Sequence, residues 1–228
     1  MAAIAHAEVA QNSNQSTTSA SYVDITGASI ASGSFTAGKK YLLWVSAQYG
    51  TGTVDIVTGM QVLHGTTVFA ESEMLGAATN ILPDRSTYNW FHVWTAVSGE
   101  GIKMQFKSNG TATLNCDQIH LFAMNLSDDL TENTDWLFAE VATATINFGS
   151  TPVDGASVTF TPSGASDWLV AVWGQFVAAA ANLFSALIRS GEAASSVPES
   201  RTEQNVTGDR FVVMNPRVFA LTAASNTF

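Results

Sequence analysis

The chain has 228 residues, of which 46% are hydrophobic and only 12% are charged, and its formal net charge is −10. The nine Lys and Arg residues form no cationic stripe that could neutralise phosphates, so we expect no direct nucleic-acid binding. A surface this poor in charge suits packing against neighbouring molecules better than a free existence in solution. Cys116 is the only cysteine, which rules out a disulfide framework and a cysteine-based zinc site.

The first part of the chain alternates apolar and polar residues with a period of two and is rich in Val, Ile, Thr and aromatic residues. Turns that contain Gly or Asn separate the runs, and no long amphipathic helix is predicted. Short strands joined by such turns are typical of an antiparallel sandwich. The predicted strands are residues 5–10, 22–35, 41–49, 58–64, 66–71, 88–97, 102–107 and 111–126.

The acidic, polar segment 127–135 is the predicted linker, and it is short enough that the two halves should pack against each other or against a shared partner. The uncharged stretch 168–188 approaches the length of a membrane span, but Gly174, Gln175 and Asn182 interrupt it. We therefore predict buried strands there and no membrane contact. The strands predicted in the second part are residues 138–142, 153–160, 168–176, 184–189 and 211–221.

The second part of the chain repeats the pattern of the first, because residues 6–10, 27–30 and 41–49 return in order as 138–142, 155–158 and 168–176. This self-similarity predicts an all-β fold of two tandem antiparallel β-sandwich domains, 1–128 and 129–228, related by internal duplication. The second repeat stops where the first continues into strands 102–107 and 111–126, so we expect it to lack its last hairpin. Either the natural chain is longer, or a neighbouring subunit supplies the missing strands.

Strand 41–49 carries large apolar side chains on both of its faces, with Trp44 opposite Tyr41 and Leu43, and strand 168–176 repeats this pattern. An antiparallel sandwich strand normally has one wet face, so Trp44 and Trp173 require a second cover. That cover is the other domain, another subunit, or loops of the same domain. We predict five interface residues: Trp44, Trp173, Trp90, Trp94 and Phe228 or its continuation.

Trp90, His92 and Trp94 share one face of a predicted strand, an arrangement that also suits a sugar-stacking platform. The four histidines have no ligand-like spacing, so we expect no metal site. A Ser nucleophile with its His and Asp, a phosphate-binding loop and a dinucleotide fingerprint are all missing from the sequence. We therefore predict no enzyme activity, no catalytic residues and no cofactor.

Several segments resemble tailed-phage structural proteins: residues 22–25, 35–41, 60–73, 88–97, 103–106, 110–114 and 119–126. Proteins of that kind carry jelly-roll-like sandwiches that serve as capsid decorations, head fibres or tail components. The resemblance implies a jelly-roll-like fold and a virion protein, assembled in the host cytoplasm, that stabilises a capsid or tail. Its implied partners are other virion proteins and further copies of itself, with a trimer as the expected symmetric form. The alternative is a carbohydrate- or receptor-binding fibre module that uses exposed aromatic residues.

Overall fold

The structure is a computed structural model, and all of its strands pair in antiparallel fashion. Within the described part of the chain the regular elements are strands and short 3-10 segments such as Ser32–Ser34, so the predicted all-β class is confirmed. No helix in that part is long and apolar enough to span a membrane. The described residues are 6–52, 56–69, 72–78, 86–128, 130–132, 134–139, 159–161, 166–177, 182–186, 189–190, 195–196, 200–204, 210–221 and 226–227.

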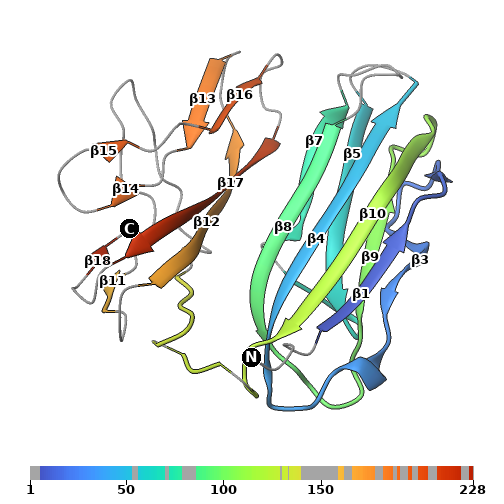
Figure 1. Cartoon of the computed structure of the whole chain (residues 1–228). Coiled ribbons are helices and arrows are strands. Elements are labelled where there is room, and N and C mark those ends of the chain that lie inside the picture. Colours follow the sequence, from blue (N-terminus) through green and yellow to red (C-terminus); the bar gives the residue numbers. More distant parts are fainter. Residues whose placement is uncertain are drawn as a thin grey trace.

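Two sheets make up the first half of the chain (Figure 1). The first sheet has the strand order β1-β10-β4-β8, and β2 also pairs with β10. The second sheet has the order β3-β9-β5, and both β6 and β7 pair with the free side of β5. The strands are β1 (His6–Gln11), β2 (Gln15–Thr17), β3 (Val23–Ile30), β4 (Lys40–Thr51), β5 (Ile56–His64), β6 (Thr67–Val68), β7 (Met74–Ala78), β8 (Ser86–Thr95), β9 (Ile102–Lys107) and β10 (Leu114–Asn125).

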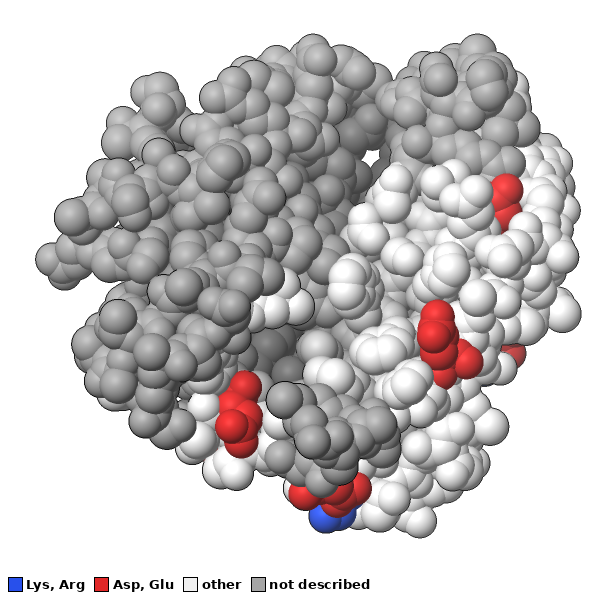
Figure 2. Space-filling view, in the orientation of Figure 1, with Lys and Arg blue, Asp and Glu red and all other residues white. Residues whose placement is uncertain are grey.

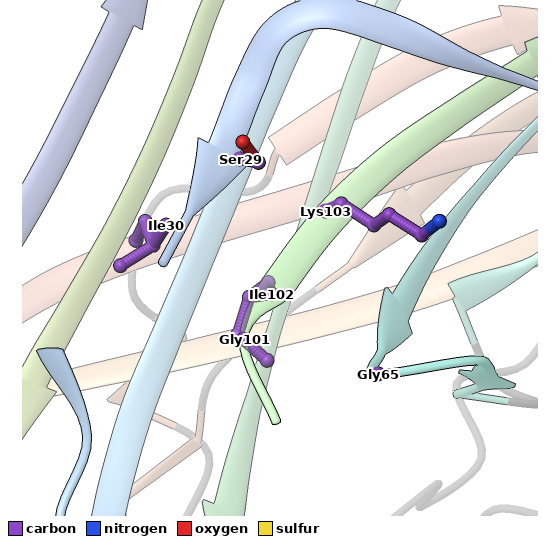
Figure 3. Close-up of a pocket in the computed structure, with 6 residues that line it drawn as sticks. All are labelled: Ser29, Ile30, Gly65, Gly101, Ile102 and Lys103. Atoms are coloured by element: carbon purple, nitrogen blue, oxygen red, sulfur yellow. The ribbon is translucent and has the colours of Figure 1, made fainter. Parts of the chain in front are cut away.

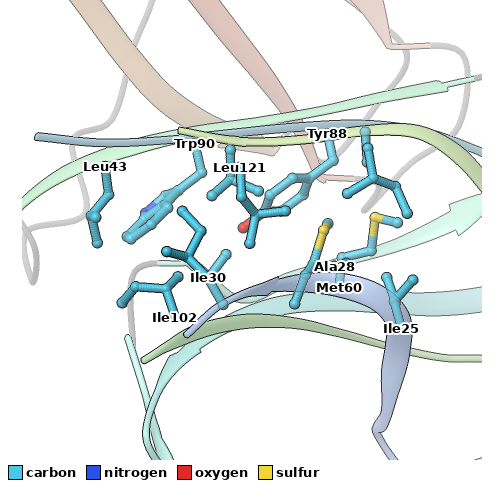
Figure 4. Packing of buried hydrophobic residues seen from close by; sticks show 14 of the residues in the cluster. Ile25, Ala28, Ile30, Leu43, Met60, Tyr88, Trp90, Ile102 and Leu121 are labelled. Carbon is cyan, nitrogen blue, oxygen red and sulfur yellow. The ribbon is translucent and has the colours of Figure 1, made fainter. Parts of the chain in front are cut away.

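One hydrophobic core lies between these two sheets (Figure 4). Alternate residues of β4 and β9 are buried, because successive side chains of a strand point to opposite faces of the sheet. The first sheet contributes Leu43, Tyr88 and Trp90 to the core, and the second sheet contributes Met60 and Ile102 from the other side. The result is a two-layer, sandwich-like arrangement, which we call the first sandwich.

A β-bulge interrupts β10 between Asp117 and His120, where Gln118 has a φ of 47°. The extra residue changes the phase of the strand, because one inserted residue moves the side chains that follow to the opposite face. Cys116 before the bulge and Ile119 after it are consequently both buried, although they are separated by an odd number of positions. The predicted run 111–126 is therefore one strand with a phase shift.

The described strands of the second half form four antiparallel pairs. The predicted strands 168–176 and 211–221 are confirmed as β12 and β17, and β17 lies beside β7 and β8 (Figure 1). Of the predicted strand 138–142, Phe138 and Ala139 are outside any strand and the rest lies outside the described residues. Only the last two residues of 153–160 are described. The pairs are β11 (Thr159–Phe160) with β18 (Asn226–Thr227), β12 (Ser166–Val177) with β17 (Arg210–Leu221), β13 (Asn182–Ala186) with β16 (Ser200–Gln204), and β14 (Arg189–Ser190) with β15 (Ser195–Ser196).

The linker that follows β10 is attached to the start of β4 by charged contacts. Lys39 Nζ lies 2.8 Å from a carboxylate oxygen of Asp128, and Lys40 Nζ lies 2.5 Å from one of Glu132. Lys40 Nζ also lies 5.4 Å from the centroid of the Trp136 ring, within cation–π range. The first residues after the first sandwich therefore pack against it.

Candidate interaction surface

Trp44 lies in the middle of β4 on the face of the first sheet that points away from the core. Its chain neighbours Leu43 and Val45 are each 1% exposed, whereas Trp44 is 40% exposed. This is the arrangement that the alternation of residues 41–49 predicts. An exposed indole in the centre of a sheet places a large apolar group in water, which makes this face the first candidate for a contact surface.

The outward side chains of β10, β4 and β8 form two apolar rows across the sheet. One row has Trp44 at its centre and the other has Leu42, and the members of each row are direct cross-strand partners. Directly opposite residues have Cβ atoms roughly 5 Å apart, so the rows form a continuous apolar surface. We call this surface the Trp44 face, and its residues are Leu42, Trp44, Phe91, Val93, Phe122 and Met124.

The borders of the Trp44 face are polar. On the β1 side Glu8 is the partner of Phe122, and the His6 ring stacks on Phe122 with 5.6 Å between the ring centroids. Towards the end of β4 the next outward row begins with Ser46, whose partner on β10 is His120. Figure 2 shows this side of the molecule with only isolated charged groups over the sheet. The face is thus nearly neutral on a chain whose net charge is −10.

The predicted interface residues Trp90 and Trp94 lie on the opposite face of β8, inside the first sandwich. They are 0% and 5% exposed, respectively. The Trp90 ring contacts Phe69 at 5.1 Å between centroids and stacks on His92 at 5.6 Å, while Trp94 makes an edge contact with Phe35 at 5.1 Å. Both tryptophans therefore belong to the core, and neither is available to a partner or a sugar in this conformation.

Phe91 and Phe122 are half-buried members of the Trp44 face, and they were not among the residues predicted from the sequence. Phe91 lies between Trp90 and His92, so the alternation of β8 placed it on the face opposite Trp90. The alternation of side chains along β8 is therefore the signal that could have identified Phe91 as an outward residue. The sequence does not give the strand register that pairs Phe91 with Trp44, because that pairing joins segments far apart in the chain.

In the second half, Trp173 lies on β12 with Met214 of β17 as its partner, but its side chain is outside the described residues. Leu169 is on the same face of β12 four residues earlier, and it is 66% exposed. Phe228 lies outside the described residues. An outward apolar side chain is thus present in the second half as well, next to the predicted position.

A small pocket with a volume of about 170 Å³ lies at the start of β9 (Figure 3). Its polar side chains are those of Ser29 and Lys103, and the Lys103 ammonium pairs with Asp24 at 3.0 Å. Ligand sites usually combine an apolar cavity with several converging polar groups, which this pocket lacks. Among the described residues, no group of His, Cys, Asp or Glu is arranged to hold a metal ion. The pocket is lined by Ser29, Ile30, Gly65, Gly101, Ile102 and Lys103.

The fold and its surface define a class of molecule, namely an all-β protein of paired antiparallel sheets with an apolar outer sheet face. Comparison with protein-family models and with curated proteins finds no match for this chain. We therefore infer the function from the outward sheet face, the strand topology and the pattern of the sequence.

Proposed function

We propose that this protein is a non-enzymatic structural component of a virus particle, which stabilises a capsid or tail through contacts between subunits. The observation that carries the proposal is the Trp44 face, an apolar surface on the outside of a sheet. Removing apolar surface from water contributes about 25 cal/mol of favourable free energy per Å². Binding of this kind stabilises an assembled particle by mass action.

The strand order of the first sandwich supports a jelly-roll fold. The pairs are nested along the chain, since β1 pairs with β10, β3 with β9, β4 with β8, and β5 with β7. Nested antiparallel pairs divided between two sheets are the arrangement of a jelly roll, in which two Greek keys are folded together. Viral capsid domains use this fold, but so do lectins, so the topology supports the proposal only in combination with the Trp44 face.

The pairing in the second half supports internal duplication. There β12 pairs with β17 and β13 pairs with β16, which repeats the nested order of β4 with β8 and β5 with β7. The alignment of 41–49 with 168–176 also carries the pair Tyr41–Trp94 onto the pair Trp168–Phe219, which is aromatic again. The exposed Leu169 then corresponds to Leu42 of the Trp44 face. The second half accordingly has at least one outward apolar side chain at the position that matches the Trp44 face.

The alternative function, a carbohydrate- or receptor-binding fibre module, relied on a platform formed by Trp90 and Trp94. Sugar stacking requires aromatic faces that are open to solvent, and these two side chains are buried in the core. The alternative therefore loses the residues on which it depended, and the structural role is the function we propose.

Sedimentation of virus particles tests the proposal. We expect an antibody against this chain to detect it in purified, intact particles on a density gradient. The variant Trp44→Asp should be lost from the particles, because it places a charge in the centre of the apolar face. Val97→Asp is the matched control, since Val97 is 47% exposed outside the Trp44 face and the substitution adds the same charge. Absence of the wild-type chain from purified particles would refute the virion role.

A further inference from the structure

We propose that Asn109 is a site of spontaneous deamidation, and that the turn around it directs the reaction to aspartate in preference to isoaspartate. This modification goes beyond the virion role and does not depend on it. Three observations carry the proposal: Asn109 is followed by Gly110, both residues are exposed, and three hydrogen-bond donors converge on the side-chain carbonyl oxygen of Asn109.

Asn109 and Gly110 lie at the tip of the turn that connects β9 with β10, where both are exposed to water. Gly110 has a φ of 91°, a backbone conformation that residues with a side chain rarely adopt. Its N–H donates no hydrogen bond to any group among the described residues. The backbone nitrogen of Gly110 is therefore open to base, and no side chain on Gly110 hinders its approach to Cγ of Asn109.

Deamidation begins when the backbone nitrogen of Gly110 gives its proton to hydroxide and attacks Cγ of Asn109. A bond forms between this nitrogen and Cγ, the bond from Cγ to Nδ2 breaks, and ammonia leaves with a proton taken from water. Closure to the cyclic succinimide is helped by proximity, because the reacting atoms belong to adjacent residues. Water then opens the ring, so the overall reaction consumes water and releases ammonia.

The succinimide has two carbonyl carbons at which water can add, and the choice decides the product. Addition at Cγ gives aspartate with the original backbone, whereas addition at the backbone carbonyl carbon of position 109 gives isoaspartate, whose main chain runs through Cγ. Asn109 Oδ1 accepts hydrogen bonds from the Thr111 N–H, the Thr111 hydroxyl and the Ala112 N–H, each at 3.0 Å. Donors on Oδ1 polarise Cγ and stabilise the negative charge that develops when water adds there.

The same three donors also favour the aspartate product over isoaspartate. Hydrogen bonds to a carboxylate are stronger than those to a neutral amide, so an aspartate at position 109 would hold Thr111 and Ala112 more firmly than Asn109 does. In isoaspartate Oδ1 becomes a main-chain carbonyl oxygen, which displaces it from these donors. Each conversion to aspartate adds a negative charge to a chain whose net charge is −10.

The turn is anchored by contacts that do not involve the Asn109 side chain. The Ser108 hydroxyl donates to the carbonyl oxygen of Ala112 at 2.7 Å, and the Ser108 N–H donates to the carbonyl oxygen of Ser19 at 2.7 Å. Ser108 itself is buried. These bonds keep the donors of Thr111 and Ala112 near position 109 while its side chain reacts.

Asn12 is the matched internal control because it is also exposed but lacks these features. The residue after it is Ser13, which has a side chain and whose N–H donates to Oε1 of Gln11 at 2.9 Å. Asn109 is the one Asn in the sequence that precedes Gly. Conversion should therefore be concentrated at Asn109.

Peptide mapping by mass spectrometry tests the proposal on the full-length chain incubated at mildly alkaline pH. Asn109 should convert about tenfold faster than Asn12 or more, and Gly110→Ala should slow conversion at Asn109 by a similar factor. Chromatography separates aspartate from isoaspartate peptides, and the aspartate share should be higher in the folded chain than in the same chain unfolded in urea. Thr111→Val removes a donor and should lower the aspartate share. An added Cβ at position 110 would meet only Ala20, at 3.5 Å, so Gly110→Ala should still fold.

Each result decides the proposal in one direction. Preferential conversion of Asn109, with an aspartate share that falls in urea and in Thr111→Val, supports it. The proposal is overturned if Asn109 converts no faster than Asn12, or if the aspartate share is unchanged or higher in urea or in Thr111→Val. These outcomes leave the virion role untouched, because the sedimentation experiment does not depend on position 109.

Discussion

Two tryptophans on neighbouring strands test which side of the first sheet faces the core. Trp90 of β8 is the cross-strand partner of Val45 and is 0% exposed, whereas Trp44 of β4 points to the opposite face and is 40% exposed. We predict that Trp90→Ala destabilises the first sandwich by about 3 kcal/mol and that Trp44→Ala costs about 1 kcal/mol. The same substitution should therefore have different effects at two sites that are close together.

The magnitude for Trp90 follows from burial and from one polar atom. A fully buried Trp removes roughly 150–250 Å² from water, which corresponds to about 4–6 kcal/mol as an upper bound. The indole N–H of Trp90 is buried without a hydrogen-bond partner, and such an orphan donor costs about 1–3 kcal/mol in the native state. Trp90→Ala loses the favourable burial but also removes the unfavourable orphan donor. The net decrease in the free energy of unfolding is therefore about 3 kcal/mol. Trp90→Phe should be less destabilising, because it keeps most of the packing and removes the orphan donor.

Hydrogen exchange in increasing urea measures these changes in the first sandwich of the intact chain. The peptides that cover β4 and β10 report its opening, and a low protein concentration keeps contacts between molecules from contributing. Equal destabilisation by Trp44→Ala and Trp90→Ala would refute the assignment of the two faces. A loss below about 1 kcal/mol for Trp90→Ala would show that this side chain is not in a packed core.

Two further predictions concern the second sheet. A Cβ atom on Gly101 would lie 2.5 Å from the carbonyl oxygen of Ile30 and 2.9 Å from the amide nitrogen of Ser32, so Gly101→Ala should destabilise the protein by about 2 kcal/mol or more in urea unfolding. Gly33→Ala is its control because nothing lies within 4 Å, and an equal loss in both variants would contradict the predicted clash. Burial, together with its hydrogen bond to Glu73 (2.9 Å) and the negative charge there, raises the pKa of Tyr22 above its usual value. A raised pKa contributes stability that is present below about pH 10 and is lost as the pH rises towards the folded-state pKa. The wild type should therefore lose more stability than Tyr22→Phe between about pH 8 and pH 11, and parallel losses would remove Tyr22 as the cause.

Local patterns were sufficient for the strands that alternate strongly. The run 102–107 became β9 with the predicted bounds, because apolar residues alternate there with polar ones. The run 41–49 became the centre of β4, because it is rich in the aromatic and β-branched residues that favour strands. The predicted strand 22–35 ends earlier, at Ile30, because a 3-10 turn begins at Ser32.

Two strands of the first half were not predicted because their residues have little preference for a strand. β7 contains Gly76, Ala77 and Ala78, which are depleted in strands, and β2 is a short polar segment, Gln15–Thr17. Both pair with strands that the sequence does identify, β5 and β10, and these partners supply the hydrogen bonds. Tertiary pairing therefore overrides local preference at both positions.

The amino-acid order alone established the all-β class, the positions of the main strands, and the fact that Trp44 is opposite Leu43 and Val45 on its strand. It could not establish which tryptophans are buried, because both faces of β4 and β8 carry large apolar side chains and alternation says only which residues share a face. Packing of the second sheet against one side placed Trp90 and Trp94 in the core and left Trp44 outside. The register between distant strands then joined Trp44 to Phe91 and Phe122, a contact that no local pattern contains.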